Sequence, residues 1–589
     1  MKDFFKMVFA SMVGMILSFF VIFILLFVVV AAIIATVDND KVKVADNSVI
    51  HMSLDHPIQE RSSKNPFEKF DFGGLESKKN VGLNDILKSL KRAKADEKIE
   101  GIFLDVSSVQ AGTATIEEIR NALLDFKKSG KFILAYSEIY TQKGYYLASV
   151  ANKIYLNPEG ILEFNGLSTE LPFFKGTLDK LEIEAQVIKV GTYKSAVEPF
   201  ILEKMSEANR TQVTSFLGSM YEHFLSAVSK SRKIPRDSLF AIANQLKVRQ
   251  APDAVRYKLA DGLRYKDQVL DELKSRTGIE KEKEMKSVSL TDYIKNNPSE
   301  EEGDFNDHIA MVYASGEIIG GEGGDETIGS ERLSRTIRKA RLDKKVKALV
   351  LRVNSPGGSA LASDVIWREI MLTKKVKPVI VSMGDVAASG GYYIACAADS
   401  IFAQPNTITG SIGVFGIIPN MQKFFNNKLG LTFDGVKTAE YADLGSVTRP
   451  LTDGERLIIQ NEVNRIYDTF TQRVAQGRKK QQGYVNEIGQ GRVWSGSEAL
   501  QNGLVDKLGD IDDAIRSAAK MAKLTDYKVV AYPAQKDPFE SLFNLSEDKV
   551  KDYFAKKELG EQYHYYQQLK SALQFTGIQA RLPYAIDIK

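Results

Sequence analysis

The sequence predicts an α/β protein that contains two copies of one domain with mostly parallel strands, preceded by one N-terminal transmembrane helix. Residues 7–37 contain no charged side chain. Further along, residues 99–166 follow the same order of segments as residues 346–413, with Gly144 opposite Gly391. Because the repeated unit is as long as a domain, it indicates an internal duplication and not a solenoid.

The length and composition fit two large domains with additional segments. The chain has 589 residues, of which 44% are hydrophobic, and one hydrophobic core rarely serves so many residues. The 79 basic and 75 acidic residues leave a net charge of +4, so we exclude nucleic acid as the main partner. The one cysteine, Cys396, stands in an apolar run and is expected to be a buried small hydrophobe.

Residues 1–45 are predicted to anchor the chain in the inner membrane. The charge-free stretch exceeds the roughly 20 apolar residues that cross a bilayer, and it is too long for the apolar part of a cleaved signal peptide. Lys2 and Lys6 precede the stretch, whereas Asp38 and Asp40 follow it. The positive-inside rule therefore places the short N-terminus in the cytoplasm and the rest of the chain on the periplasmic side, although two further lysines soon after the stretch count against this orientation.

Behind the anchor, each copy alternates short strands rich in β-branched residues with helices, which is typical of an α/β unit. The expected strands are 101–106 and 132–136 in the first copy, and 348–353 and 378–382 in the second. The expected helices are 115–128 and 360–375. The predicted organisation is an anchor (1–45), a first domain (46–290), a polar linker (291–306), a second domain (307–530) and a helical C-terminal extension (531–589).

The candidate nucleophile lies in the second copy. Residues 380–391 read as an apolar strand that runs into a glycine-rich turn, with Ser389 at the start of an apolar helix. At such a place a hydroxyl lies beside unpaired helix N–H groups and the positive end of the helix dipole, which stabilise an oxyanion. In the first copy Gln142 stands opposite Ser389, so that copy lacks the nucleophile.

A serine nucleophile needs a base, and Lys194 is the candidate. The chain has five histidines, none of which lies between residues 309 and 563. Burial disfavours an ammonium and lowers a lysine pKa from about 10.4 by up to roughly 3–5 units. The flanks of Lys194 are largely apolar, although Glu198 would oppose this change if it faced the amine. The alternative is a surface lysine before a proline turn.

The second copy has no lysine at the matching position, where Glu440 stands. Each copy therefore supplies what the other lacks. We infer one complementary site between the two halves in preference to two equivalent sites.

A second glycine turn is a candidate for binding the oxyanion. The segment Asn354-Ser-Pro-Gly-Gly places Gly357 and Gly358 between a strand and a helix, where backbone N–H groups can point into a cleft without a Cβ in the way. The alternative is an ordinary turn between a strand and a helix. Residues 107–113 of the first copy lack the Pro-Gly-Gly sequence, so the glycine pair accompanies the serine.

No metal or other cofactor is expected. The sequence has no His, Cys or carboxylate cluster with metal-ligand spacing. The segment Gly191-Thr-Tyr-Lys194-Ser lacks the glycine that precedes the lysine in a phosphate-binding loop, so nucleotide binding is poorly supported.

The motifs resemble those of the signal peptide peptidase A (protease IV) family in its long, double-domain form. The resemblance covers about residues 45–530 together with the anchor. The motifs that carry it are Val-Gly-Thr-Tyr-Lys194-Ser-Ala-Val-Glu-Pro, Asn354-Ser-Pro-Gly-Gly-Ser, Gly384-Asp-Val-Ala-Ala-Ser389-Gly-Gly-Tyr-Tyr, Thr409-Gly-Ser411-Ile-Gly-Val and Gly491-Arg-Val-Trp-Ser-Gly.

The resemblance implies tandem ClpP/crotonase-like domains with Ser389 as nucleophile and Lys194 as general base. It also implies that Gly358 and Gly390 lie near the oxyanion, and that Ser411 hydrogen-bonds the lysine amine. The family forms a homotetramer on the membrane and degrades signal peptides after their release. We therefore expect a membrane-anchored serine endopeptidase that acts on signal peptides and other apolar peptides.

Two alternatives come from other functional classes. A crotonase-like acyl-CoA enzyme would share the glycine turn and would not need the Ser389 and Lys194 pair. A non-catalytic membrane scaffold would keep the fold with either residue dispensable.

Overall fold

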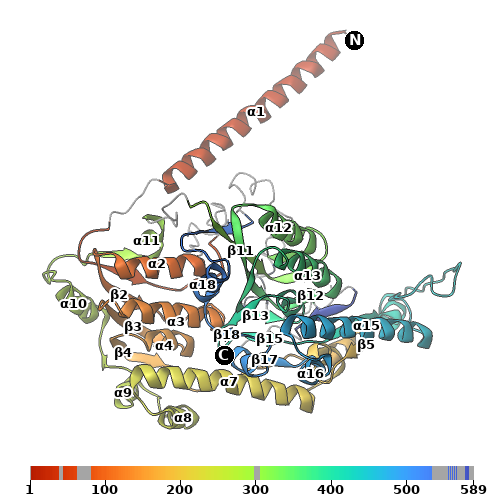
Figure 1. Ribbon diagram of the computed structural model, residues 1–589. Helices are drawn as coiled ribbons and strands as arrows, with labels where there is room; N and C mark the ends of the chain where they lie inside the picture. Colours follow the sequence, from red (N-terminus) through yellow and green to blue (C-terminus); the bar gives the residue numbers. More distant parts are fainter. Residues whose placement is uncertain are drawn as a thin grey trace.

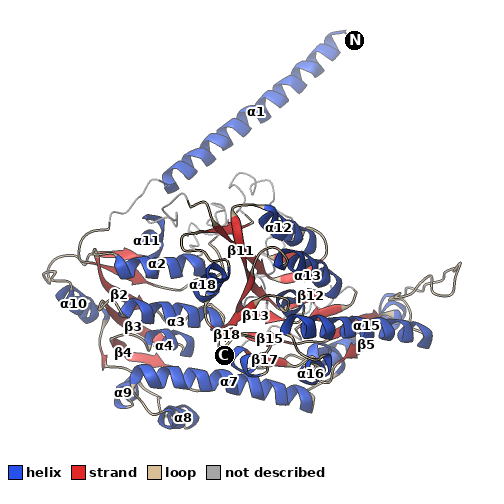
Figure 2. Ribbon diagram, viewed as in Figure 1, coloured by secondary structure: helices blue, strands red, loops and turns tan. Residues whose placement is uncertain are grey.

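The computed structural model describes residues 2–38, 44–62, 81–296, 305–324, 326–533 and 577–582, together with single positions between 555 and 566. Two α/β halves lie side by side, and helix α1 (Lys2–Asp38) projects away from both (Figure 1). Helices cover the sheets of each half (Figure 2).

Helix α1 contains the candidate membrane span. Its stretch Asp3–Leu25 has 23 residues with a mean hydropathy of 2.7, and none of it is buried against the rest of the chain. At about 1.5 Å per residue this stretch is roughly 35 Å long, enough to cross a hydrocarbon core about 30 Å thick. Part of the predicted anchor, residues 39–43, lies outside the described residues.

The first half is built on a parallel sheet. Its central strands are apolar on both faces because helices cover both faces. The strand order is β6 (Gly262–Leu263), β4 (Lys153–Leu162), β3 (Phe132–Tyr140), β2 (Ile99–Asp105), β1 (Ser48–Met52) and β7 (Ser287–Ser289). The helices of this half are α2 (Leu83–Ala95), α3 (Thr113–Lys127), α4 (Gln142–Ala148), α5 (Lys175–Lys180), α6 (Glu198–Ile201), α7 (Glu207–Arg232), α8 (Arg236–Asn244), α9 (Ala251–Arg256), α10 (Lys266–Arg276) and α11 (Leu290–Asn296).

The second half repeats this plan in a larger sheet, parallel except where β15 meets β17. The main strand order is β17 (Val493–Ser495), β15 (Ile408–Gly410), β13 (Val379–Ala388), β11 (Val346–Ser355), β8 (His308–Ser315) and β19 (Lys528–Tyr532), with β14 (Ser400–Ala403) and β18 (Lys507–Leu508) branching from β13. The helices are α12 (Ser330–Leu342), α13 (Ala360–Lys374), α14 (Gly390–Ala395), a π-helix (Phe424–Leu429), α15 (Asp453–Arg478), α16 (Gln482–Ile488), α17 (Gly496–Gln501) and α18 (Ile511–Met521).

A third, mixed sheet joins the halves. Strand β5 of the first half pairs antiparallel with β16 of the second over seven positions, from Val190 opposite Val414 to Glu184 opposite Asn420. The order of this sheet is β10 (Thr327–Gly329), β9 (Glu317–Ile319), β12 (Gly357–Ser359), β20 (Gln579–Arg581), β16 (Val414–Asn420) and β5 (Glu184–Val190).

Helix α7 also spans both halves. It begins after Ser206, whose side chain accepts the Asn209 N–H, and it ends at Lys233 in the left-handed conformation. The helix runs beneath the first half and continues below the second (Figure 1), where the hydroxyl groups of Ser219 and Ser495 lie 2.7 Å apart. Its length therefore holds one half against the other.

A buried ion-pair network lies at the boundary between the halves. The fully buried Arg352 guanidinium of β11 contacts Glu60 at 2.9 Å and Glu118 of α3 at 2.6 Å, and both carboxylates belong to the first half. Burial raises the pKa of Glu118 to about 7, and the adjacent Arg352 counteracts part of this rise. The neighbouring Asp385 accepts hydrogen bonds from the backbone N–H and the hydroxyl of Thr115.

The structure confirms the predicted fold class of two tandem α/β domains with mostly parallel strands. The strands expected at 101–106, 132–136, 348–353 and 378–382 correspond to β2, β3, β11 and β13. The predicted helical extension 531–589 lies mainly outside the described residues, but its residues 579–581 form a strand and not a helix. A short strand forms there because it hydrogen-bonds to β12 on one side and β16 on the other.

Replacement of Arg352 by alanine tests the boundary between the halves. We expect Arg352→Ala to lower the free energy of unfolding by about 3–5 kcal/mol, because it leaves two buried carboxylates without their cation. Urea unfolding of the full-length protein in detergent measures this loss.

The control for this prediction is Arg335→Ala, which removes an exposed ion pair with Glu322. An exposed pair contributes about 1 kcal/mol or less, so this variant should unfold close to the wild type. Equal, small losses in both variants would contradict a stabilising network at the boundary.

Candidate active site

Ser389 joins the end of β13 to the first turn of α14. Its backbone has φ 53° and ψ −112°, and a positive φ is uncommon for a residue with a Cβ atom. The backbone N–H of Ser389 donates to the Gly410 carbonyl at 2.8 Å, which ties the turn to β15. The first N–H groups of a helix have no acceptor within the helix, so the Ser389 hydroxyl lies beside potential oxyanion donors.

The predicted oxyanion glycines meet at this turn. Gly357 and Gly358 have φ values of 96° and 155°, and a Cβ atom at Gly358 would lie 2.0 Å from the Ile318 carbonyl oxygen. A Cβ atom at Gly357 would lie 2.7 Å from the Gly390 backbone nitrogen. Glycine is therefore required at both positions, and its absence of a side chain lets the backbone of β12 approach the start of α14.

Lys194 belongs to the first half, and its side chain extends into the second half. It follows β5 by a short turn, and the β5–β16 pairing carries this turn across the boundary. A Cβ atom at Gly491 would lie 2.6 Å from the Cα of Lys194, and one at Gly413 would lie 3.1 Å from its Cδ. The side chain of Lys194 therefore passes through a channel that two glycines of the second half leave open.

Three predicted site residues meet at the end of this channel. The Nζ of Lys194 is 3.1 Å from the Oγ of Ser389 and 3.1 Å from the Oγ of Ser411. It also donates to the Ser411 carbonyl at 3.4 Å, whereas the Ser389 hydroxyl donates to the Gly413 carbonyl at 3.4 Å. Lys194, Ser389 and Ser411 each have 0% of their surface exposed.

The surroundings of Lys194 favour a neutral amine. Burial alone holds its pKa well below the ordinary value of 10.5. Glu198 does not oppose this change, because its carboxylate accepts hydrogen bonds from Ser206 and Asn209 instead. The ring of Phe415 lies beside the amine, with its centroid 5.8 Å from Nζ. A neutral amine at this distance from a hydroxyl can accept its proton.

Gln142 of the first copy matches Ser389, and Glu440 of the second copy matches Lys194. Gln142 is buried at the start of α4, where its amide binds the backbone of Asn165 and Gly166. Glu440 lies on an exposed loop of the second half. Among the described residues, neither of these two side chains forms a hydrogen bond with the Ser389 hydroxyl.

Sequence reasoning missed Gln212, a buried residue of α7 that fixes the lysine turn. Its side-chain amide donates to the Tyr193 carbonyl at 3.1 Å and to the Ser195 hydroxyl at 2.9 Å, and its oxygen accepts the Val493 N–H at 3.1 Å. The amide thereby links the lysine turn to β17. The signal that could have found it is a polar side chain on the buried face of an amphipathic helix.

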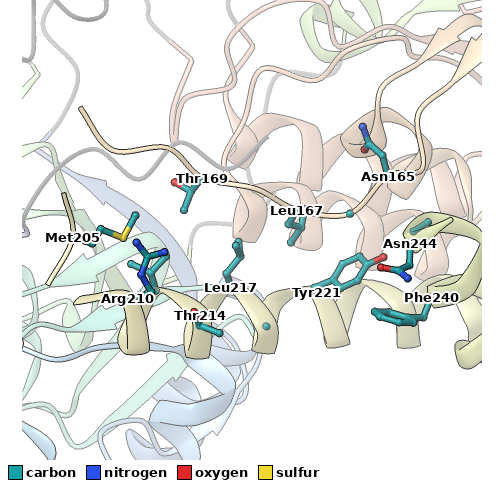
Figure 3. Close-up of a pocket in the computed structure, with 14 residues that line it drawn as sticks. Asn165, Leu167, Thr169, Met205, Arg210, Thr214, Leu217, Tyr221, Phe240 and Asn244 are labelled. Carbon is teal, nitrogen blue, oxygen red and sulfur yellow. The ribbon is translucent and has the colours of Figure 1, made fainter. Parts of the chain in front are cut away.

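A cavity of about 450 Å³ lies between α7 and residues 165–169 (Figure 3). Leu217 and Tyr221 of α7 and Leu167 of the facing segment line it, with Arg210 at one end. Leu167 and Leu217 pack against a cluster that contains Ala388, the residue before Ser389. Two residues that line the cavity thus pack in the same apolar cluster as the end of β13.

Among the described residues, no group of three or more His, Cys, Asp or Glu side chains could hold a metal ion. The site itself brings together the hydroxyl groups of Ser389 and Ser411, the buried amine of Lys194 and backbone N–H groups of the glycine turns. This set fits nucleophilic attack on a carbonyl, with the amine as the base.

Comparison with known proteins places the chain among peptidases. Residues 125–280 and 371–525 each match Peptidase family S49. "Protease 4" of Salmonella typhi is 41% identical over 460 residues, which cover 76% of this chain and 74% of that protein. "Protease 4" of Haemophilus influenzae is 37% identical over 461 residues, 77% of this chain and 75% of that protein. The structure of a ClpP1 mutant from Listeria monocytogenes matches with 18% identity and a TM-score of 0.24, covering 35% of this chain and 94% of that chain.

The buried amine predicts a pH-dependent stability. Because the unfolded chain has the ordinary lysine pKa of 10.5 and the folded chain a lower one, the unfolded chain binds more protons between the two values. The wild type should therefore lose stability as the pH falls from 10.5 toward the lowered pKa. Lys194→Met removes this loss, so the variant should be more stable than the wild type at pH 7, by a margin that narrows as the pH rises.

Thermal unfolding of both full-length proteins in detergent at pH 7 and pH 9.5 measures this margin. Lys180→Met, at the exposed end of α5, controls for the removal of a lysine. A margin for Lys194→Met that stays constant with pH would contradict a buried, neutral amine.

Proposed function

The chain belongs to peptidase family S49 and is a serine peptidase, and we propose that Ser389 is its nucleophile and Lys194 its general base. The observation that carries this proposal is the 3.1 Å distance between the Nζ of a fully buried lysine and the Oγ of a fully buried serine. The lysine pKa is lowered by burial, as a base that works near neutral pH requires.

In the proposed reaction the Ser389 Oγ attacks the carbonyl carbon of a peptide bond while the Lys194 Nζ accepts the hydroxyl proton. Ser411 holds the amine in line, because its Oγ is also 3.1 Å from Nζ. The resulting ammonium gives its proton to the leaving amine, and an ester between Ser389 and the substrate remains. Water then attacks this ester, with Lys194 as the base again, and releases the carboxylate product.

The negative oxygen that forms during each attack needs donors. We propose the backbone N–H groups of Gly358 and Gly390 for this role, with Gly357 allowing β12 to approach α14. Such preorganised donors contribute about 2.7–4 kcal/mol each to transition-state stabilisation in other serine hydrolases.

The family favours peptide hydrolysis over the two alternative functions. A crotonase-like acyl-CoA enzyme would use the glycine turn alone, whereas here a buried lysine from the other half reaches the serine. A scaffold would not require an amine held in an apolar channel, which is costly to bury. Both alternatives predict that Ser389 is dispensable.

We propose signal peptides and other apolar peptides as the substrates, at the periplasmic side of the inner membrane. Two features support this proposal. Helix α1 is long and apolar enough to cross a bilayer, and apolar side chains of α7 pack against Ala388, the residue before Ser389. The resemblance described above further suggests a homotetramer.

Hydrolysis by point variants tests the dyad. Full-length protein in detergent should cleave a synthetic signal peptide, and both Ser389→Ala and Lys194→Ala should lose at least about a thousandfold in kcat/KM, because nucleophile and base act as a unit. Lys180→Ala, an exposed lysine of the same half, should retain wild-type activity. Activity that persists in Ser389→Ala or Lys194→Ala would remove that residue from the mechanism.

The anchor proposal is tested by extraction from membranes. Full-length protein should stay in the membrane pellet at alkaline pH in carbonate and dissolve only in detergent, because the 23-residue stretch Asp3–Leu25 is long and apolar enough to cross the bilayer as a helix. A chain that begins at residue 46 should appear in the soluble fraction. Release of the full-length chain by carbonate would contradict a membrane-spanning anchor.

A further inference from the structure

Two buried side chains that can carry opposite charges lie one short turn apart in the lysine segment, yet they do not pair. Lys194 precedes the 3₁₀ helix Ser195–Val197, and Glu198 follows it. Lys194 has 0% of its surface exposed and Glu198 has 2%. A buried amine and a buried carboxylate so near in the chain would ordinarily stabilise each other's charged form. In this structure each of them instead has uncharged partners of its own.

The partners of Glu198 lie at the N-terminus of α7. One carboxylate oxygen accepts the Ser206 hydroxyl at 2.6 Å, and the other accepts the Ser206 N–H at 3.2 Å and the side-chain amide of Asn209 at 2.9 Å. Ser206 is the N-cap of α7, and Asn209 follows in its first turn. A helix N-terminus stabilises a negative charge through its dipole and its unpaired N–H groups. The start of α7 therefore takes the place of a cation beside Glu198.

The same helix also holds the turn that carries the lysine. Gln212, one turn beyond Asn209, donates to the residues on both sides of Lys194. Its amide also donates to the side-chain oxygen of Asn209 at 3.0 Å. Asn209 thus links the Glu198 carboxylate to the residue that fixes the lysine turn. One connected set of hydrogen bonds sets the direction of the carboxylate relative to the turn.

This direction matters because a carboxylate that faced Lys194 would favour the ammonium. An opposite charge within about 4–6 Å stabilises the charged form of a group and therefore raises the pKa of a lysine. A protonated Lys194 could not accept the Ser389 proton. The hydrogen bonds at the start of α7 turn Glu198 toward the helix instead.

The other described groups that contact the lysine and its turn are hydroxyls, one aromatic ring and cations. They are the hydroxyls of Ser389 and Ser411, the ring of Phe415, the ammonium of Lys189, which donates to the Lys194 carbonyl at 3.5 Å, and the guanidinium of Arg492, which lies 5.2 Å from the centroid of the Tyr193 ring. Nearby cations disfavour an ammonium. Among these neighbours, Glu198 is therefore the group whose direction can charge the amine.

Resting on the proposed function, we propose that Ser206 and Asn209 are positioning residues for the general base: they bind the Glu198 carboxylate at the start of α7 and so keep it from pairing with the Lys194 amine. The amine then stays neutral in its buried place and can accept the Ser389 proton. Ser206 and Asn209 act on the reaction through Glu198, not by contact with the reacting atoms.

The pH dependence of Ser389 labelling by a fluorophosphonate tests this proposal, with full-length protein in detergent. Asn209→Leu removes the amide that binds Glu198 and keeps a side chain of the same branched shape. The carboxylate can then face the amine, so the midpoint of the rise in labelling rate should move up by about one pH unit or more. Labelling should be about tenfold slower below the wild-type midpoint and should approach the wild-type rate at high pH. An unchanged midpoint overturns the proposal.

Neutralising the glutamate separates this effect from a general disturbance of the fold. Glu198→Gln in the Asn209→Leu background should return the midpoint to the wild-type pH, because no carboxylate remains to face the amine. A midpoint that stays raised in this double variant overturns the proposal. Asn461→Leu, which replaces an exposed asparagine of α15, controls for the substitution and should keep the wild-type midpoint.

Ser206→Gly tests the same contact if Asn209→Leu does not fold. It removes the 2.6 Å hydrogen bond to Glu198, while glycine is tolerated as the N-cap of a helix. The midpoint should move in the same direction by a smaller amount. A midpoint equal to that of the wild type contradicts the role that we assign to Ser206.

The wild-type profile tests the proposed function on its own. If wild-type labelling does not rise with pH, or if Lys194→Met keeps the same rise, Lys194 is not the base and the proposed function fails. A wild-type rise that depends on Lys194, together with unchanged midpoints in Asn209→Leu and Ser206→Gly, leaves the proposed dyad standing and overturns only the positioning role.

Discussion

The burial of one amine in contact with one hydroxyl is the interaction on which the rest of this structure depends. Lys194 and Ser389 are 195 residues apart in the chain and belong to different halves, yet their side chains meet at 3.1 Å in a place closed to solvent. A lysine amine in water is protonated and cannot serve as a base at neutral pH. Removing it from water lowers its pKa, so the two halves have to exclude water as well as meet.

Several features of the fold serve that requirement. The pairing of β5 with β16 carries the lysine turn across the boundary, and Gln212 fixes the turn there. The ion pairs of Arg352 with Glu60 and Glu118 also join the halves. Arg352 lies on β11, which pairs with β13, the strand that leads to Ser389. Each half thus contributes one residue to the proposed site, Lys194 from the first and Ser389 from the second.

Much of the fold could be predicted from the sequence, because strand and helix patterns repeat at a fixed offset in the two copies. The position of Ser389 at a strand-to-helix turn followed from local sequence alone. The burial of Lys194 did not, since its neighbours read equally well as a surface turn, and only the docking of the halves buries it. The channel at Gly491 and the support from Gln212 depend on contacts between distant segments, which one sequence does not reveal. Strand β20 was missed for a similar reason: residues 578–582 alternate apolar and polar side chains, but so short a run becomes a strand only between β12 and β16.

The reactivity of Ser389 toward a fluorophosphonate probe, followed over a range of pH, tests the central claim most directly. The full-length protein should be labelled at Ser389, at a rate that rises with pH as one group with a pKa well below 10.5 loses its proton. Lys194→Met should be labelled far more slowly and should lose this rise. Labelling of Lys194→Met at the wild-type rate, with the same dependence on pH, would contradict the claim that the buried amine activates the serine.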